Sequence, residues 1–114
     1  EVYTTIAETF AEYDNKIKIS LIFTASRHGE KNQILRHVEL AKKIVLDTGL
    51  TENSSLCGFD LAGDEKVCSA GEMHQYFLPL MKECMHFTIH AGEDNPVKSI
   101  WEAVYKLNAQ RIGH

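Results

Sequence analysis

The sharpest chemical signal in the sequence is the run His90-Ala91-Gly92-Glu93, which follows a short apolar segment. An imidazole nitrogen is the commonest protein ligand for zinc, and catalytic zinc keeps one position open for a water whose pKa falls to about 7. A carboxylate three residues later could carry protons, and Gly92 would let a flat substrate approach the backbone. An alternative without chemistry stays open, in which His90 closes a loop and Glu93 lies in the first turn of a helix.

A second histidine stands in the run Arg111-Ile112-Gly113-His114, 24 positions after His90, with one helix expected between them. In a parallel sheet this separation places the two histidines at the ends of neighbouring strands, on the same edge. Two histidines on one edge favour a metal site or acid–base chemistry. The alternative is that His114 is a terminal residue without a partner. A third segment, 58–65, is a strand that runs into an acidic loop, and by itself it indicates only a solvated turn.

Alternating helix and strand signals must position these residues. Helices are expected at 2–14, 30–47, 72–85 and 96–107, and strands at 17–24, 56–61, 87–89 and from 111 onward. Four strands separated by such helices predict parallel βαβ units and therefore an α/β fold. Polar residues follow each strand, at Arg27 and His28, at 60–65, at 90–93 and at His114. Since the carboxyl ends of parallel strands carry the chemistry of such folds, this pattern is typical of a functional site.

Apolar side chains at helical spacing indicate which helix faces are buried. The first helix has such a face in Val2, Ile6, Phe10 and Tyr13. The second has one in Ile34, Leu35, Val38, Ala41, Ile44 and Val45, with Gly49 at its expected stop. In the last helix, a stripe of Val97, Trp101, Val104 and Tyr105 predicts packing against the sheet.

The composition describes one domain, residues 1–114, with 44% hydrophobic and 25% charged residues. Its 12 Lys and Arg against 16 Asp and Glu give a net charge of -4 at pH 7, which argues against nucleic acid as a partner. No apolar run is long enough to span a membrane and the amino-terminal segment lacks the basic and then apolar layout of a signal peptide, so a cytoplasmic protein without membrane association is expected. Cys57, Cys68 and Cys84 fit neither a disulfide framework nor a CxxC signature, so we expect free thiols.

Together and in this order, these segments resemble the adenosine deaminase family, within the metal-dependent amidohydrolase superfamily of (β/α)8 barrels. The resemblance covers most of the chain, through Ser26-Arg27-His28, GFDLAGDE at 58–65, HAGE at 90–93 and SIWEAVYKLNAQRIGH at 99–114. It implies parallel βα units that form about half of a (β/α)8 TIM-type barrel, four strands with intervening helices. The zinc site of the cytidine deaminase type is excluded because no two cysteines have its C-x-x-C spacing.

The resemblance also implies roles for four residues. His90 would be a ligand of one zinc ion, and Glu93 would donate a proton to N1 of a purine ring as activated water attacks C6. His114 would orient and polarise that water, and the backbone of Gly63 would contact the purine. The implied reaction is the hydrolysis of adenosine or deoxyadenosine to inosine and ammonia, with a small-molecule purine nucleoside as the partner. An adenine or modified-purine deaminase of the same family is an alternative.

Two further aspartates of the motif, Asp60 and Asp64, are expected to have only loop and supporting roles. The family's barrel also contains a His-x-His pair on its first strand and an Asp-Asp pair near its last, and this sequence contains neither. Because catalytic zinc uses about three protein ligands, residues 1–114 alone are expected to be inactive. We therefore expect a central part of a longer deaminase, whose other parts supply the remaining strands and zinc ligands. The alternative from another class is a non-catalytic α/β half-barrel that pairs with another chain.

Overall fold

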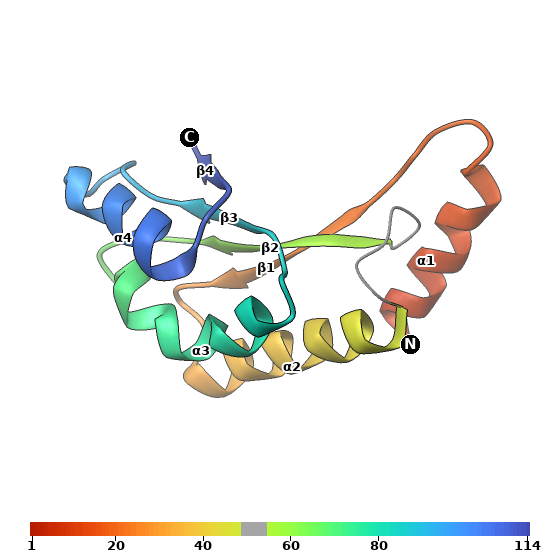
Figure 1. The fold of residues 1–114 in the computed structure, drawn as a ribbon, viewed down its shortest axis with the longest axis horizontal. Helices are drawn as coiled ribbons and strands as arrows, with labels where there is room; N and C mark the ends of the chain where they lie inside the picture. The colour runs from red at the N-terminus through yellow and green to blue at the C-terminus, as the bar shows by residue number, and fades with distance from the viewer. Residues whose placement is uncertain (49–54) are drawn as a thin grey trace.

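A computed structural model describes residues 1–48 and 55–114, in which helices and strands alternate along the chain (Figure 1). The elements are α1 (Val2–Tyr13), β1 (Leu21–Ser26), α2 (Lys31–Thr48), β2 (Leu56–Ala62), α3 (Ala70–Lys82), β3 (Phe87–His90), α4 (Val97–Leu107) and β4 (Arg111–Gly113). The order of elements is the predicted one, and the fold is α/β.

The four strands form one parallel sheet in the order β1-β2-β3-β4. Each strand pairs with the next one along the chain, and a helix leads from the end of one strand back to the start of the next. This sequential order is that of a (β/α)8 barrel, in which consecutive strands follow one another around the ring. The described residues form about half of such a barrel, which confirms the predicted fold class.

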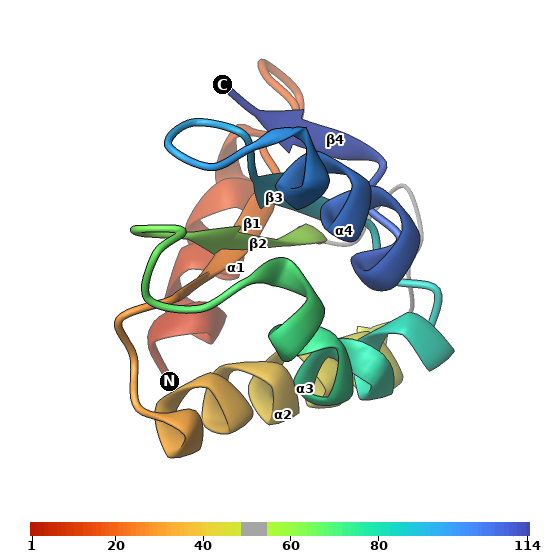
Figure 2. The ribbon, with the colours of Figure 1, turned by 90° about the vertical axis from the view of Figure 1, so that its left-hand side faces the viewer.

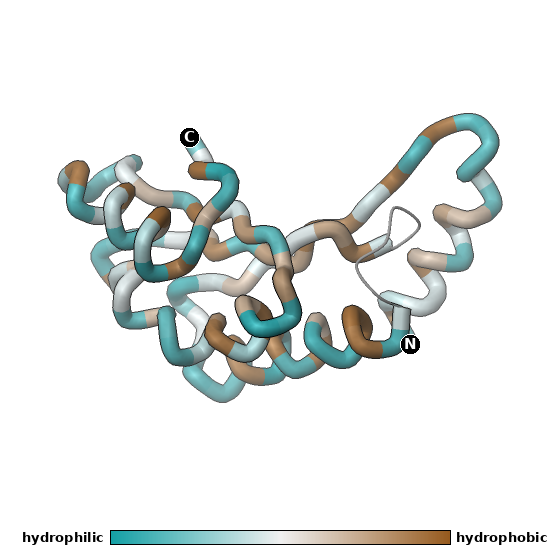
Figure 3. Tube along the Cα trace, viewed as in Figure 1, coloured by the Kyte–Doolittle hydropathy of each residue, from teal (hydrophilic) through white to brown (hydrophobic). Residues whose placement is uncertain are grey.

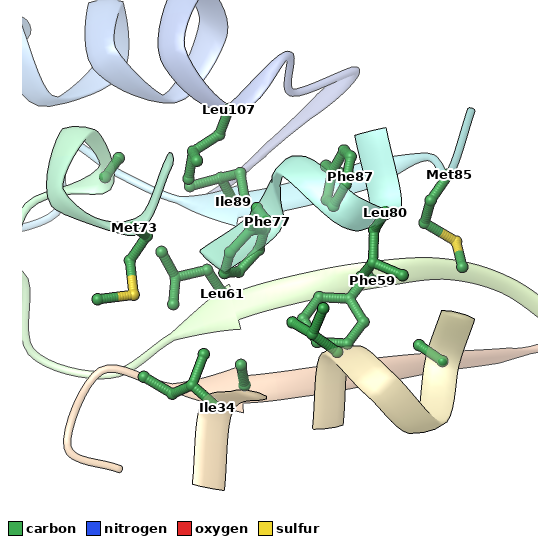
Figure 4. Close-up of a cluster of buried hydrophobic side chains, with 14 of the residues drawn as sticks. Ile34, Phe59, Leu61, Met73, Phe77, Leu80, Met85, Phe87, Ile89 and Leu107 are labelled. Atoms are coloured by element: carbon green, nitrogen blue, oxygen red, sulfur yellow. The ribbon is translucent and has the colours of Figure 1, made fainter. Parts of the chain in front are cut away.

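The hydrophobic core lies between the sheet and the helices α2, α3 and α4, which cover one of its faces (Figures 1 and 2). At its centre, the ring of Phe77 packs edge-on against Phe59, with ring centroids 5.3 Å apart, and tilted against Phe87 at 5.6 Å (Figure 4). All three rings are fully buried, and Phe59 lies next to Phe87 in the register of β2 and β3. One aromatic side chain of α3 therefore spans two strands and fixes the helix on the sheet.

Helix α2 has the amphipathic character that its sequence predicts. Hydrophobic and hydrophilic segments alternate along it in Figure 3. Five of its six predicted core residues are buried: Ile34, Val38, Ala41, Ile44 and Val45. Leu35 is the exception, with an exposed fraction of 36%, because it lies at the margin of the apolar stripe. The expected stop of this helix at Gly49 lies outside the described residues.

The other face of the sheet is more polar. In the strand register Thr24 lies next to Asp60, Asp60 next to Thr88, and Thr88 next to Arg111. Because side chains alternate along a strand, these residues lie on the face opposite the aromatic core. His90 comes two residues after Thr88 and shares that face. In a closed barrel this face would point inward.

The first strand is shorter than predicted. It was expected over 17–24, but β1 begins at Leu21, where the pairing of Leu21 with Leu56 starts. Ile17 precedes this pairing and is 58% exposed. A β-branched, apolar segment has strand propensity, but it becomes a strand only where a neighbouring strand lies beside it.

The predicted apolar face of α1 is not buried among the described residues. The exposed fraction is 76% for Val2 and 48% for Tyr13, and no residue of α1 is buried. Its aromatic contact to the sheet comes from Tyr3, whose ring lies edge-on to Phe23 with centroids 5.9 Å apart. The helical period was correct, but a period alone does not show what covers the apolar face.

The prediction that the aromatic stripe of α4 packs on the sheet is wrong for the described residues. Trp101 is 49% exposed and Tyr105 71%, and their rings contact each other with centroids 5.2 Å apart. The residues of α4 that are fully buried are Ala103 and Leu107, on the face toward α3 and the sheet. A small side chain at 103 lets the two helices approach closely, which turns the larger aromatic rings outward.

In the described part of the chain, no helix combines the length and the apolar character that are needed to cross a membrane.

Helix α3 begins two residues before its predicted start, because Ser69 and Glu72 form a capping box. The hydroxyl of Ser69 accepts a hydrogen bond from the Glu72 backbone at 3.2 Å, and the Glu72 carboxylate accepts one from the Ser69 backbone at 2.6 Å. Hydrogen bonding from the Ser69 backbone and side chain lowers the pKa of Glu72. The Ser-x-x-Glu spacing is a sequence signature of a helix start.

The first prediction concerns this cap. The Ser69→Ala variant should lower the free energy of unfolding by about 1 kcal/mol, because the amide of Glu72 loses its acceptor. Ser69→Asp is the matched control, since a carboxylate at this position still accepts the bond and should preserve stability within about 0.5 kcal/mol. Urea denaturation of both variants measures the difference. Equal stability of Ser69→Ala and Ser69→Asp would contradict the role of the cap.

Candidate active site

The two histidines predicted to share an edge of the sheet do lie together. His90 ends β3 and is next to Gly113 in the register, and His114 follows directly after β4. The two imidazole rings are 5.1 Å apart between centroids, with an angle of 57° between their planes. His90 is the last residue of β3 and His114 comes directly after the end of β4, so this pair lies at the carboxyl edge of the sheet. Parallel pairing therefore places both imidazoles where α/β enzymes carry their chemistry.

Gly113 is required by the position of the His90 ring. A Cβ atom built at residue 113 would lie 1.7 Å from His90 Cδ2 and 2.5 Å from Nε2. The ring therefore lies directly against the backbone of β4, in a space that any side chain at 113 would fill. This contact explains why a glycine precedes the second histidine.

Glu93 lies on the turn that follows β3, close to His114. Its Oε2 atom is 3.8 Å from His114 Nε2, and both side chains are more than half exposed, at 54% and 59%. Gly92 before it has a φ of +83°, a left-handed conformation that favours glycine. The Glu93 backbone amide donates a hydrogen bond of 2.8 Å to Oε1 of Glu65. The carboxylate and the two imidazoles thus form one cluster at the sheet edge.

Gly63 lies at the end of β2, on the same edge of the sheet. Its φ is +97°, and a Cβ there would lie 3.0 Å from His28 Cδ2 and 3.3 Å from the Arg27 amide nitrogen. The next amide, that of Asp64, donates a hydrogen bond of 3.2 Å to His28 Nε2. His28 is therefore a loop histidine that is hydrogen-bonded to the backbone. The loop keeps the Gly63 backbone exposed.

Asp60 is not a loop residue, contrary to expectation. It lies inside β2, with an exposed fraction of 8%, on the polar face of the sheet. Burial raises its pKa, while the nearby His90 and the hydroxyl of Thr24, at 3.4 Å, act in the opposite direction. Its second oxygen, Oδ1, has no hydrogen-bond partner among the described residues. A charged residue within an apolar strand was the signal that could have indicated this position.

Arg27 and Glu65 lie beneath the cluster, and sequence reasoning assigned no role to either. Their exposed fractions are 3% and 5%. Arg27 donates to the carbonyl oxygens of Cys68 and His90, and Glu65 accepts from the amide of Glu93. Both were recognised only as polar residues that follow a strand. No local pattern distinguishes a buried charge from a solvated one in such a loop.

Metal-ligating side chains do not form a complete metal site in the part of the chain that the structure describes. Within 1–48 and 55–114, no three His, Cys, Asp or Glu side chains are grouped so that they could hold a metal ion. His90 has the chemistry of a zinc ligand, and its ring has a defined position against Gly113.

Cys57, Cys68 and Cys84 are free, as predicted, and burial raises the pKa of the Cys68 thiol.

The comparisons with known proteins agree with this geometry. The family model described as adenosine deaminase matches residues 1–114. This chain belongs to the adenosine deaminase family. The chain is 34% identical to adenosine deaminase 1 of Streptomyces coelicolor over 121 aligned positions, which cover 100% of the chain. It is 42% identical to the adenosine deaminase of Gallus gallus over 78 residues, or 68% of the chain.

A solved structure shows the same fold. The crystal structure of adenine deaminase from Arthrobacter aurescens matches 96% of this chain with a TM-score of 0.70 and 24% sequence identity. The match covers 32% of that structure, and the chain spans 28% and 20% of the lengths of the Streptomyces and Gallus relatives.

The second prediction concerns the contact of His90 with Gly113. In the full-length protein, Gly113→Ala should displace the His90 ring and lower the free energy of unfolding by about 1–3 kcal/mol through overpacking. Gly71→Ala is the matched control, because a Cβ there meets only the flexible carboxylate of Glu102, at 3.1 Å. Crystal structures and urea denaturation of both variants test this. An unmoved His90 ring in Gly113→Ala would contradict it.

Proposed function

We propose that this chain is part of a zinc-dependent purine nucleoside deaminase that hydrolyses adenosine or deoxyadenosine to inosine and ammonia. The observation that carries the proposal is the cluster of His90, Glu93 and His114 at the carboxyl edge of a parallel sheet. Relatives that are 34% and 42% identical are adenosine deaminases, and this favours the nucleoside over adenine as the substrate.

His90 would hold the zinc ion. Its ring lies on the polar face of the sheet, and its place against Gly113 gives the imidazole a defined direction before any metal binds. When bound, zinc would supply a water acidified enough to act as a nucleophile at neutral pH. Because such a site uses about three protein ligands, the remaining ones would come from the rest of a (β/α)8 barrel, of which residues 1–114 are one partial domain.

Glu93 would act as the proton donor. A carboxyl group beside the site can protonate N1 of the purine as C6 becomes tetrahedral, which removes the negative charge that would otherwise build up on the ring. His114, whose Nε2 lies 3.8 Å from the Glu93 carboxylate, would orient the attacking water. The exposed backbone of Gly63 would contact the purine, because the absence of a side chain lets a flat ring approach.

The third prediction tests these roles in the natural protein that contains this chain. Glu93→Gln should lower kcat for adenosine by about 10²–10⁴-fold, the usual contribution of a positioned acid or base, and leave zinc content unchanged. His90→Ala should lose both zinc and turnover. The loss of adenosine absorbance measures turnover, and atomic absorption measures zinc.

His37→Ala is the matched control, because His37 is an exposed histidine on α2. It should keep the zinc content and the turnover of the wild-type protein. If the wild-type protein neither binds zinc nor deaminates a purine nucleoside, the proposed function is wrong. The non-catalytic half-barrel would then be the better interpretation.

A further inference from the structure

Arg27 and Glu65 take no step in the proposed reaction, yet they are charged side chains buried beneath its residues. Their exposed fractions are 3% and 5%. A charge in such a place is costly unless hydrogen bonds compensate for its lost hydration. Here the hydrogen-bond partners are backbone groups, the carbonyls of Cys68 and His90 for Arg27 and the amide of Glu93 for Glu65. Arg27 Nε and Glu65 Oε2 have no partner among the described residues.

Arg27 connects three parts of the sheet edge. It follows β1, and its guanidinium donates one hydrogen bond of 2.6 Å to the carbonyl of Cys68 and another of 2.6 Å to the carbonyl of His90. The planar guanidinium presents its donors in a fixed geometry, so these two carbonyls are held at a defined separation. Through the second bond, Arg27 fixes the backbone of the residue proposed to bind zinc.

Glu65 holds the next part of the same turn. It lies in the loop after β2, and its carboxylate accepts the amide of Glu93 at 2.8 Å. Burial alone would raise the pKa of Glu65, but interactions with the backbones of Glu93 and Gly92 and the charge of Arg27 outweigh it and lower the pKa. Glu65 is therefore an anion at neutral pH, and a carboxylate is a stronger acceptor than a neutral group.

The turn between His90 and Glu93 needs such support. It contains Ala91 and Gly92, and Gly92 has a φ of +83°. A glycine backbone has more accessible conformations than that of any other residue, so this turn needs other contacts to hold its conformation. Without fixed ends, the glycine would let the carboxylate move relative to the imidazole. Displacements of about 1 Å in a catalytic group are enough to reduce the rate strongly.

We propose that Arg27 and Glu65 are positioning residues, which hold the backbones of His90 and Glu93 so that the imidazole and the carboxyl group keep their relative placement. This inference rests on the proposed function for the roles of His90 and Glu93. It assigns the two buried charges to the geometry of the turn, in addition to any effect on stability.

The fourth prediction is a separation of kcat from KM in the natural protein. Glu65→Ala should lower kcat for adenosine by about 10–100-fold, the usual effect of removing a group that orients a catalytic one, and change KM less than about threefold. Glu65→Gln keeps an oxygen acceptor for the Glu93 amide and should recover most of the lost kcat. Arg27→Lys should fall between the two, because one ammonium group does not reproduce the guanidinium fork.

Hydrogen exchange gives a second measurement that needs neither zinc nor turnover. In Glu65→Ala the amides of residues 90–95 should exchange faster than in the wild-type protein, since the Glu93 amide loses its acceptor. Phe77→Leu is the control for general destabilisation, because Phe77 is fully buried in the core and its ring packs against Phe59 and Phe87. It should lower the melting temperature and leave both kcat and exchange at 90–95 unchanged.

The outcomes separate the two proposals. Wild-type kcat and wild-type exchange in Glu65→Ala would overturn the positioning role, whatever the substrate is. An inactive wild-type protein would overturn the proposed function, whereas faster exchange in Glu65→Ala would still support the role of Glu65 in the turn. If Glu65→Ala does not fold, Glu65→Asp takes its place, because its carboxylate is one methylene too short to reach the Glu93 amide in the same geometry. Unchanged kcat and exchange in Glu65→Asp would then count against the proposal.

Discussion

The parallel pairing of β3 with β4 is the constraint on which the candidate site depends. It sets His90 beside Gly113, so the imidazole lies against a backbone that has no side chain at that point, and it brings the His114 ring to 5.1 Å. Parallel strands end at the same edge of a sheet, whereas an antiparallel pair would place the two histidines at opposite ends. The backbone register of β3 and β4 thus decides where the side chains of His90 and His114 lie relative to each other.

The two faces of the sheet have different roles: one packs against the hydrophobic core, and the other carries the polar residues of the candidate site. One face carries the aromatic core around Phe77, where helices bury large apolar side chains and the favourable transfer from water is greatest. The other carries Thr24, Asp60, Thr88 and His90, and contributes little to such burial. Since strand residues alternate between the faces, one strand serves both purposes. Substitutions on the core side should therefore change stability without altering the polar face directly.

Three ionisable side chains near the candidate site are buried, and burial of a charge is unfavourable for folding. Asp60 lies on the polar face with a raised pKa caused by burial, and Arg27 and Glu65 lie beneath the turn with exposed fractions of 3% and 5%. A hydrophobic replacement of such groups can be as stable or more stable in other proteins, so stability alone does not account for them. Their hydrogen bonds to the His90 carbonyl and the Glu93 amide give them a geometric role instead.

The sequence alone determined the alternation of helices and strands, the parallel α/β fold and the placing of His90 and His114 on one edge, because these follow from local periodicity and the chirality of βαβ units. The family resemblance carried by HAGE and RIGH was confirmed, whereas the roles of individual residues stay predictions. Only the tertiary structure showed that Arg27 is buried, that Glu65 accepts a hydrogen bond from the Glu93 amide, that the apolar face of α1 is at most half-buried and that the apolar stripe of α4 is exposed. These features depend on contacts between segments that are distant in sequence, and neither composition nor residue spacing predicts which segments pack together.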